Sequence, residues 1–320
     1  MKRPFIIDCD TGTDDTIAII AALGCEDMEI VGITSVNGNV PEDYTSRNNL
    51  NLIEYLGYDI PVTHGAVLPL AGTKDLNASA NIHGLTGLGS TTLPEAQKNT
   101  YDPRIASEFI YQEARVRNGD LELLVTGPMT NIAICLCEHP DLPKYIRHLY
   151  FMGGSTLGGN VNTSAEFNIW VDPEALHVVF GSGMPLTMVG LNVSNLTEMR
   201  PEEEHLLRSF GTREGDLAAD LVHYMMNRNT TKKKVYGANM HDPLALAAAM
   251  FPTCMEYEDL FADTECTGSY TRGHTAVDLF HKLGREANVS VAVEVDVKRF
   301  RQWLCERIRL AGIRGEEVRK

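Results

Sequence analysis

Residues 5–20 read FIIDCDTGTDDTIAII, a short apolar run that leads into an acidic turn and then into an apolar helical pattern. The turn holds Asp8, Asp10, Asp14 and Asp15. A strand, a glycine-containing turn and a helix form the arrangement by which an open α/β sheet presents ligand groups at the carboxyl end of a strand. Carboxylates this close repel one another unless a cation neutralises them or protons are shared. We therefore expect the turn to form the floor of a metal-dependent active site.

The bulk composition is that of an ordinary globular protein, with 43% hydrophobic and 22% charged residues among 320. A net charge of −15 argues against a nucleic-acid or anionic-membrane partner, which would need a basic face. No linker, low-complexity tract or repeat separates the two halves of the sequence. We therefore expect residues 1–320 to form a single domain that binds a small molecule.

The first residues of the chain, its apolar runs and its cysteines indicate the cellular compartment. The chain starts Met1-Lys2-Arg3-Pro4 and lacks the apolar segment of a signal peptide, and no apolar run is long enough to span a membrane. Its seven cysteines are scattered, and the spacing of Cys135 and Cys137 fits neither a zinc site nor a thioredoxin motif. This pattern predicts free thiols in a reducing compartment and a cytoplasmic protein.

Short apolar strands alternate with amphipathic helices through the first half of the chain, which predicts an α/β fold with a doubly wound, mostly parallel, Rossmann-like sheet. The second half reads as more helical, with a small β appendage at 267–295. Long loops are expected at 70–97 and 228–240. Predicted strands are 5–7, 29–34, 61–63, 121–126, 148–152 and 185–191. Predicted helices are 14–23, 43–56, 104–117, 129–137, 173–180, 201–210, 215–227, 243–250 and 300–310.

Further polar segments follow predicted strands or open a predicted helix, where such folds build sites. Each is weak evidence alone, because a Gly-Gly pair is usual in turns and an Asp before Pro is a common helix N-cap. Their convergence at one sheet edge is the informative feature. The four segments are Val36-Asn37-Gly38-Asn39, Thr126-Gly127-Pro128, Met152-Gly153-Gly154 and His241-Asp242-Pro243. The third is followed along the chain by Asn160, Glu166-Phe167-Asn168 and Asp172.

In these motifs the whole chain resembles the nucleoside hydrolases, the calcium-dependent N-ribohydrolases. The acidic turn 8–15 is similar to the signature of that family, although Thr11 stands where proline is more usual. The resemblance implies the nucleoside hydrolase fold and hydrolysis of the N-glycosidic bond of ribonucleosides. It extends through Asn37-Gly38-Asn39, His83-Gly84 with Gly87-Leu88-Gly89, Thr126-Gly127-Pro128, Met152-Gly153-Gly154, Ala165-Glu166-Phe167-Asn168 and His241-Asp242-Pro243.

The resemblance also implies a ligand set for Ca²⁺. Carboxylates of Asp10, Asp15 and Asp242 and the main-chain carbonyl of Thr126 would bind the ion, with substrate hydroxyls and a water completing it. Hard oxygen ligands of this kind are what Ca²⁺ requires, and they do not suit zinc.

Catalytic and substrate-binding roles follow by the same resemblance. Asp14 would be the general base that activates the water held by calcium. His241 would donate a proton to the leaving base, with His83 as a second group on the base side. The ribose would be held by Asn39, Asn160, Glu166 and Asn168, with Met152 packed under the ring and Phe167 near the base.

Some alternatives stay open at the level of sequence. Pyrimidine-preferring members carry a Gln and a Tyr before the His-Asp motif, and that pair is absent at the same spacing here, so a modified, tRNA-derived nucleoside is a second candidate substrate. A haloacid-dehalogenase-type phosphohydrolase with Asp8 as nucleophile and Mg²⁺ is a more remote alternative. A nucleoside-binding protein without turnover is the non-enzymatic one. Family members are commonly homodimers or homotetramers, and we expect the same here.

Overall fold

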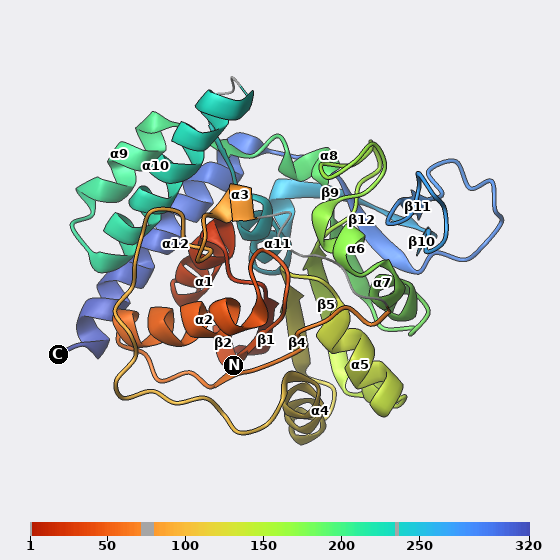
Figure 1. The fold of residues 1–320 in the computed structure, drawn as a ribbon, viewed down its shortest axis with the longest axis horizontal. Coiled ribbons are helices and arrows are strands. Elements are labelled where there is room, and N and C mark those ends of the chain that lie inside the picture. Colours follow the sequence, from red (N-terminus) through yellow and green to blue (C-terminus); the bar gives the residue numbers. More distant parts are fainter. Residues whose placement is uncertain (1, 72–79, 234–236) are drawn as a thin grey trace.

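A twisted sheet of eight strands lies at the centre of the protein (Figure 1). The computed structural model describes residues 2–71, 80–233 and 237–320. Neighbouring strands are parallel from one edge through β12, and β9 runs antiparallel to β12 at the other edge. This confirms the predicted α/β, mostly parallel fold. In spatial order the strands are β3 (Val62–Thr63), β2 (Met28–Ser35), β1 (Arg3–Cys9), β4 (Leu121–Val125), β5 (Ile146–Met152), β6 (Leu186–Val189), β12 (Val289–Val295) and β9 (Met255–Leu260).

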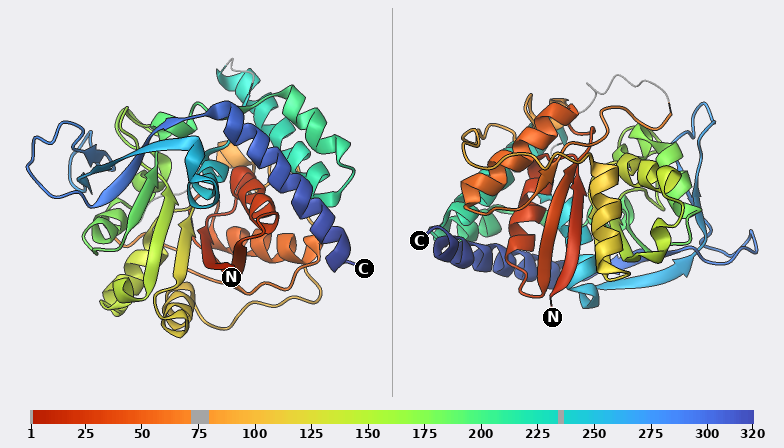
Figure 2. Two further views of the ribbon diagram at one scale, coloured as in Figure 1. Left: turned by 180° about the vertical axis from the view of Figure 1, so that it is seen from behind. Right: turned by 90° about the horizontal axis from the view of Figure 1, so that it is seen from below.

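Helices cover both faces of this sheet (Figure 2). One face is covered by α1 (Thr13–Leu23), α2 (Glu42–Leu56), α10 (Arg213–Lys233), α11 (His241–Met250) and α12 (Val297–Val318). The opposite face is covered by α4 (Ala106–Arg117), α5 (Thr130–Glu138) and α7 (Pro173–Phe180). The remaining helices are α3 (Ala80–His83), α6 (Phe167–Val171), α8 (Leu191–Ser194) and α9 (Pro201–Ser209), with 3₁₀ turns at Leu142–Lys144 and Pro252–Cys254.

Strand β1 separates two hydrophobic cores by the alternation of its side chains. Phe5, Ile7 and Cys9 belong to the core under α1, whereas Ile6 belongs to the core under α5. All four are buried, and a strand buried on both faces reads as a continuous apolar run. This explains why the opening strand shows no polar alternation.

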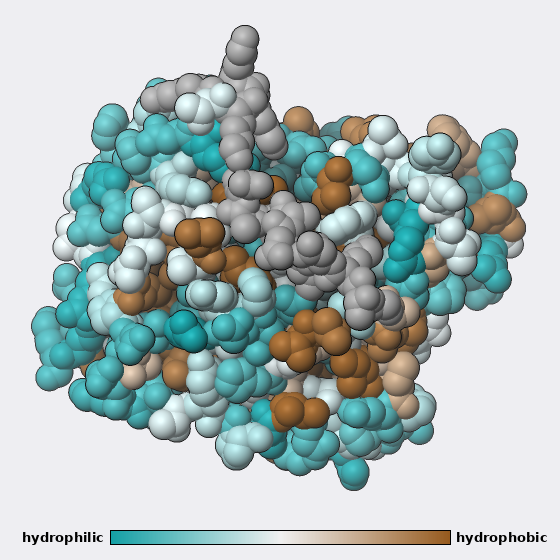
Figure 3. All heavy atoms as spheres, in the orientation of Figure 1, coloured by the Kyte–Doolittle hydropathy of each residue, from teal (hydrophilic) through white to brown (hydrophobic). Residues whose placement is uncertain are grey.

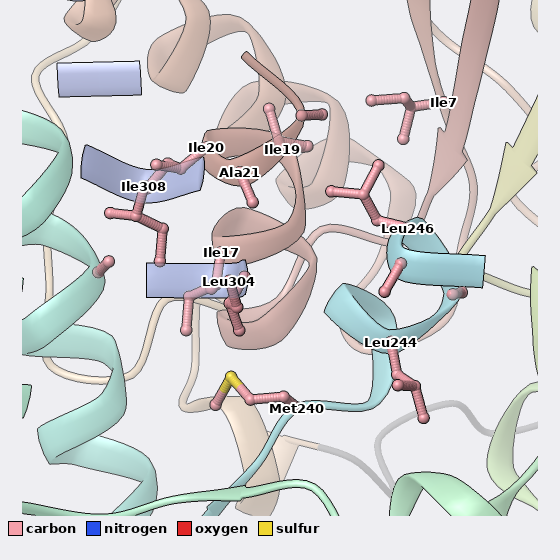
Figure 4. Packing of buried hydrophobic residues seen from close by; sticks show 14 of the residues in the cluster. Ile7, Ile17, Ile19, Ile20, Ala21, Met240, Leu244, Leu246, Leu304 and Ile308 are labelled. Carbon is pink, nitrogen blue, oxygen red and sulfur yellow. The ribbon is translucent and has the colours of Figure 1, made fainter. Parts of the chain in front are cut away.

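Helix α1 is buried along its whole length, so its packing fixes the acidic turn in place. Ile17 and Ile20 lie beside Leu304 and Ile308 of α12, and Leu246 of α11 lies on the side of α1 toward β1 (Figure 4). Because the helix is held from several sides, its first turn cannot shift without disturbing the core.

Parts of the second half differ from the prediction. Residues 228–233 continue α10 instead of forming a loop, and α12 runs to Val318 rather than ending at 310. The prediction of a small β appendage at 267–295 was partly wrong, because β12 joins the central sheet. Strands β10 (Ala262–Thr264) and β11 (Thr275–Val277) form a separate ribbon.

The predicted loop 70–97 contains α3, and its residues 72–79 lie outside the described part of the chain. Besides the central sheet and this ribbon of β10 and β11, the described residues form one more two-stranded sheet, which pairs β7 (Glu198–Met199) with β8 (Ala238–Asn239).

The surface in Figure 3 is mostly hydrophilic around a few apolar clusters, in keeping with the excess of acidic residues. Among the described residues, no helix combines the length and apolar character needed to cross a membrane.

The strand order reverses at β1, which has β2 on one side and β4 on the other. In open parallel sheets, ligands bind outside the carboxyl ends of the strands at this switch point. Asp10 follows β1 and Thr126 follows β4, so both lie at the expected place.

Candidate active site

The turn after β1 carries Asp10 into close contact with the turn after β2. Asn39 donates its backbone N–H to Asp10 Oδ2 at 2.7 Å and its side-chain Nδ2 to Asp10 Oδ1 at 3.2 Å. A Cβ on Gly38 would fall 2.0 Å from Asp10 Oδ2, so only glycine permits this approach. The Asn-Gly-Asn motif therefore positions Asp10.

Asp14 and Asp15 lie in the first turn of α1, where the helix dipole favours negative charge. Asp15 Oδ2 accepts hydrogen bonds from Gly12 N at 2.9 Å and from Asn39 Nδ2 at 3.1 Å. Its other oxygen accepts from Thr126 Oγ1 at 2.7 Å. Asp15 therefore ties the ends of β1, β2 and β4 together.

Asp242, more than 200 residues further along, enters the same site at the start of α11. Asp14, Asp15 and Asp242 each present a carboxylate oxygen, and these oxygens lie within 4.8 Å of one another. All three side chains are buried. The structure thus unites the acidic turn with the His-Asp motif.

Burial dominates the electrostatics of this cluster. It raises the pKa of Asp14 to about 7, with a further contribution from the charge of Asp15. Burial also raises the pKa of Asp15, and it raises the pKa values of Asp10 and Asp242 well above the usual range, reinforced by the neighbouring carboxylates. The mutual repulsion is what a bound cation would relieve.

The donor set fits a hard divalent cation. Carboxylate oxygens make up the group, and no cysteine or histidine belongs to it among the described residues. Asp10 is outside the group of three but is linked to Asp15 through Asn39. The geometry alone groups Asp14 with Asp15 and Asp242, whereas the family resemblance implies Asp10 as the further ligand.

The end of β5 and the start of α6 complete the floor of the site. Asn168 Nδ2 donates to the carbonyl oxygen of Thr126 at 2.7 Å and to that of Met152 at 3.1 Å. Glu166, the N-cap of α6, accepts from the backbone N–H groups of Gly154 at 3.1 Å and Asn168 at 3.0 Å, and burial raises its pKa to about 7. These residues bring a carboxylate and an amide beside the predicted metal ligand.

His83, the last residue of α3, reaches the cluster from outside the central sheet and contacts the start of α1. The backbone N–H of Thr13 donates to His83 Nδ1 at 3.3 Å, and Asp14 Oδ1 lies 4.0 Å from the same nitrogen. Burial, followed by the charge of Arg228, lowers the pKa of His83 to about 3. The ring is therefore neutral, and because Nδ1 accepts, Nε2 carries the proton.

His241 is the first residue of α11, next to Asp242. Its Nδ1 lies 2.8 Å from the hydroxyl of Ser194, a fully buried residue of α8. Ser194 was missed at the level of sequence. It follows β6 as Asn39 follows β2, so the rule of polar residues after strands would have found it.

Asn160 and Phe167 are less closely associated with the carboxylates. Asn160 lies on an exposed loop, where its backbone N–H bonds to the carbonyl of Ala165. Phe167 is partly exposed and stacks on Trp170 with ring centroids 6.3 Å apart. Within the part of the chain that the structure describes, neither side chain makes a recorded contact with the cluster.

Asp8 faces away from the cluster. It is fully buried, and its Oδ1 accepts from Thr34 Oγ1 at 2.5 Å and from Asn131 Nδ2 of α5 at 2.8 Å. An aspartate enclosed in this way anchors the strand and cannot reach a phosphate ester. The phosphohydrolase alternative therefore has no support in the geometry.

A mostly parallel sheet with buried carboxylates at its switch point is an arrangement typical of α/β enzymes. Residues 5–302 match the family described as inosine-uridine preferring nucleoside hydrolase. The chain belongs to this family, as the sequence predicted, and is accordingly a hydrolase that acts on N-glycosyl compounds.

Relatives of known structure and name agree over nearly the whole chain. The pyrimidine-specific ribonucleoside hydrolase RihA of Enterobacter sp. (strain 638) is 36% identical over 318 residues, which cover 98% of this chain and 100% of that protein. The purine-preferring ribonucleoside hydrolase from Gardnerella vaginalis is also 36% identical, with a TM-score of 0.91 over 97% of this chain and 99% of that one. The plant nucleoside hydrolase PpNRh1 is 27% identical, with a TM-score of 0.91 over 96% and 99% of the two chains.

Proposed function

We propose that this protein hydrolyses ribonucleosides to free base and ribose in a calcium-dependent reaction with Asp14 as the general base. The observation that carries the proposal is the buried cluster of Asp14, Asp15 and Asp242, whose oxygens lie within 4.8 Å of one another at the switch point of the sheet.

In this proposal Asp10, Asp15, Asp242 and the carbonyl of Thr126 would hold calcium. When bound, Ca²⁺ would lower the pKa of the attacking water and contribute to the binding of ribose. The all-oxygen donor set supports this choice over zinc.

Asp14 accepts the proton of the attacking water. The water oxygen forms a bond to the anomeric carbon while the C–N bond breaks, and the bonding electron pair leaves with the base nitrogen. The transition state is oxocarbenium-like, so buried carboxylates beneath the ring stabilise its positive charge. A carboxyl pKa of about 7 suits a general base at neutral pH.

Ribose is bound by Asn39, Glu166, Asn168 and Asn160, with Met152 packed under the ring. The first three are supported by their burial and by hydrogen bonds that lock them against the cluster. Asn160 has to approach from its exposed loop, as Phe167 has to approach the base, when substrate binds.

His241 donates a proton to the departing base. The contact between Nδ1 and the buried Ser194 hydroxyl holds the ring, so that a proton on Nε2 can face the departing base. His83, neutral and with its Nε2 proton free of the Thr13 contact, provides a second hydrogen bond on the base side.

A panel of nucleosides assayed for free ribose tests the proposal. Inosine, guanosine, adenosine, uridine and cytidine are incubated with the enzyme before and after calcium stripping by a chelator, since names of equally similar relatives differ on the base. Ribose released from at least one nucleoside, lost on stripping and restored by Ca²⁺, is the expected result. Undiminished turnover after stripping would refute the calcium assignment.

Size-exclusion chromatography with light scattering tests the expected homodimer or homotetramer.

A further inference from the structure

Arg228 brings a positive charge close to the segment that carries His83. It lies on α10, and its Nη1 donates to the carbonyl oxygen of Ile82 at 3.0 Å, directly before His83. Its Nη2 donates to Asn229 Oδ1 at 3.0 Å. The guanidinium is therefore held beside the segment that carries His83.

A second contact of α10 involves the loop that follows His83. Tyr224 lies one helical turn before Arg228, and a Cβ on Gly89 would fall 2.6 Å from the Tyr224 ring. Arg228 is partly buried, and its hydrogen bond to Ile82 holds it one residue away from His83, which the proposed function places on the base side. The guanidinium therefore belongs to the part of the site that would receive the base.

A guanidinium at this position has chemistry that the histidines lack. It offers five N–H donors and no acceptor, and two of its terminal N–H groups are used in the contacts to Ile82 and Asn229. When the C–N bond breaks, its electron pair passes to the base. In hypoxanthine, guanine and uracil this charge spreads onto carbonyl oxygens, which a cationic donor stabilises.

Bases that carry an amino group in place of the oxo group match the guanidinium of Arg228 less well. The edge of guanine presents the O6 and N7 acceptors to which arginine binds bidentately, whereas adenine pairs its N7 acceptor with an amino donor. Hypoxanthine shares the guanine edge, and cytosine replaces the O4 acceptor of uracil with an amino donor.

We propose that Arg228 binds the oxo edge of the leaving base and gives the enzyme a preference for 6-oxopurine and uracil nucleosides over their amino counterparts. The proposal rests on the proposed nucleoside hydrolysis and assigns a specificity residue to it.

The test compares kcat/KM in two substrate pairs, inosine with adenosine and uridine with cytidine. Wild type, R228Q and R228K are measured with R213Q as the matched control. Arg213 lies at the far end of the same helix and likewise donates to a backbone carbonyl, that of Tyr55 at 2.9 Å. A hydrogen bond to a charged group contributes about 1.5–3 kcal/mol, so R228Q should lower kcat/KM for the oxo substrate of at least one pair by about 10- to 100-fold.

The ratio within each pair separates this role from a structural one, because a loss of folded enzyme lowers both members equally. We expect the oxo-to-amino ratio to collapse in R228Q, to recover partly in R228K and to stay at the wild-type value in R213Q. Equal losses on both members of each pair, or a wild type without an oxo preference, would overturn the role of Arg228 alone. A wild type that releases ribose from none of the nucleosides would overturn the proposed function as well.

Discussion

Asp8 shows how one residue of the acidic turn differs in function from its neighbours. It is fully buried, one of its oxygens has no hydrogen-bond partner among the described residues, and burial raises its pKa to about 6. Because the unfolded chain ionises near pH 4 while the folded one keeps its proton until about pH 6, Asp8 destabilises the fold as pH rises through this window.

We predict that D8N removes this dependence. The free energy of unfolding, measured with denaturant in the presence of a chelator, should rise in D8N relative to wild type between pH 4 and pH 8 by on the order of 3 kcal/mol. As a control, D120N changes an exposed aspartate that pairs with Arg147. Its difference from wild type in the free energy of unfolding should not change with pH over the same range. A D8N difference that does not change with pH would contradict the prediction.

Asp10 and Asp14 are the two residues to which the geometry and the family resemblance give different roles. If Asp14 is the base, D14N should lower kcat by about 10²- to 10⁴-fold while Ca²⁺ still binds. D10N should instead weaken calcium binding, because it removes a charged ligand. Isothermal titration with Ca²⁺ and single-turnover kinetics measure the two effects. Lost calcium binding in D14N, with retained binding in D10N, would exchange the two roles.

Residues within a motif were predictable from the sequence, and residues that act across long separations were not. The acidic turn and the His-Asp motif were expected at one edge of the sheet, and the structure brings Asp14, Asp15 and Asp242 together there, whereas the ligand role of Asp10 comes from the family resemblance. Asn131 lies 123 positions from its partner Asp8, and neither it nor Arg228 belongs to a motif. Such contacts depend on the packing of whole helices, which local pattern does not encode.

At the scale of elements, α12 continues past its predicted end at 310 and through two glycines, a residue type that is common just after the end of a helix. Gly312 and Gly315 lie within the helix, where Thr212 and Glu214 approach its backbone. Glu214 is fully buried and accepts from Arg319 near the end of α12 at 2.6 Å. The glycines therefore serve close packing, a use that sequence cannot distinguish from termination.

We predict that G315A is destabilising although alanine is favoured over glycine in helices by about 1 kcal/mol. A Cβ there would fall 2.0 Å from Glu214 Oε1, and overpacking of this kind typically costs about 1–3 kcal/mol. Denaturant unfolding should show a net loss in G315A. In an E214A background the same change should be neutral or stabilising, and an identical cost in both backgrounds would show that Glu214 is not the obstacle.

At the scale of the molecule, the fold concentrates negative charge where strands from distant parts of the chain converge. Asp10, Asp14, Asp15 and Asp242 all have raised pKa values because they are buried together. Such groups hold protons in the folded state that the unfolded chain has released, so without a cation the fold loses stability as pH rises above about 4. A cation that binds the ionised cluster opposes this loss.

We therefore predict that calcium controls both the stability of the protein and its pH dependence. In chelator, the thermal midpoint should fall between pH 5 and pH 8. Ca²⁺ at 100 times its dissociation constant should add about 2.7 kcal/mol and flatten that fall. A single domain should melt in one transition under both conditions. D242N should lose most of the calcium response, whereas D120N, which removes the same charge from an exposed site, should keep it. An equal calcium response in both variants would place the ion elsewhere, because Ca²⁺ stabilises the folded protein only through the residues that bind it.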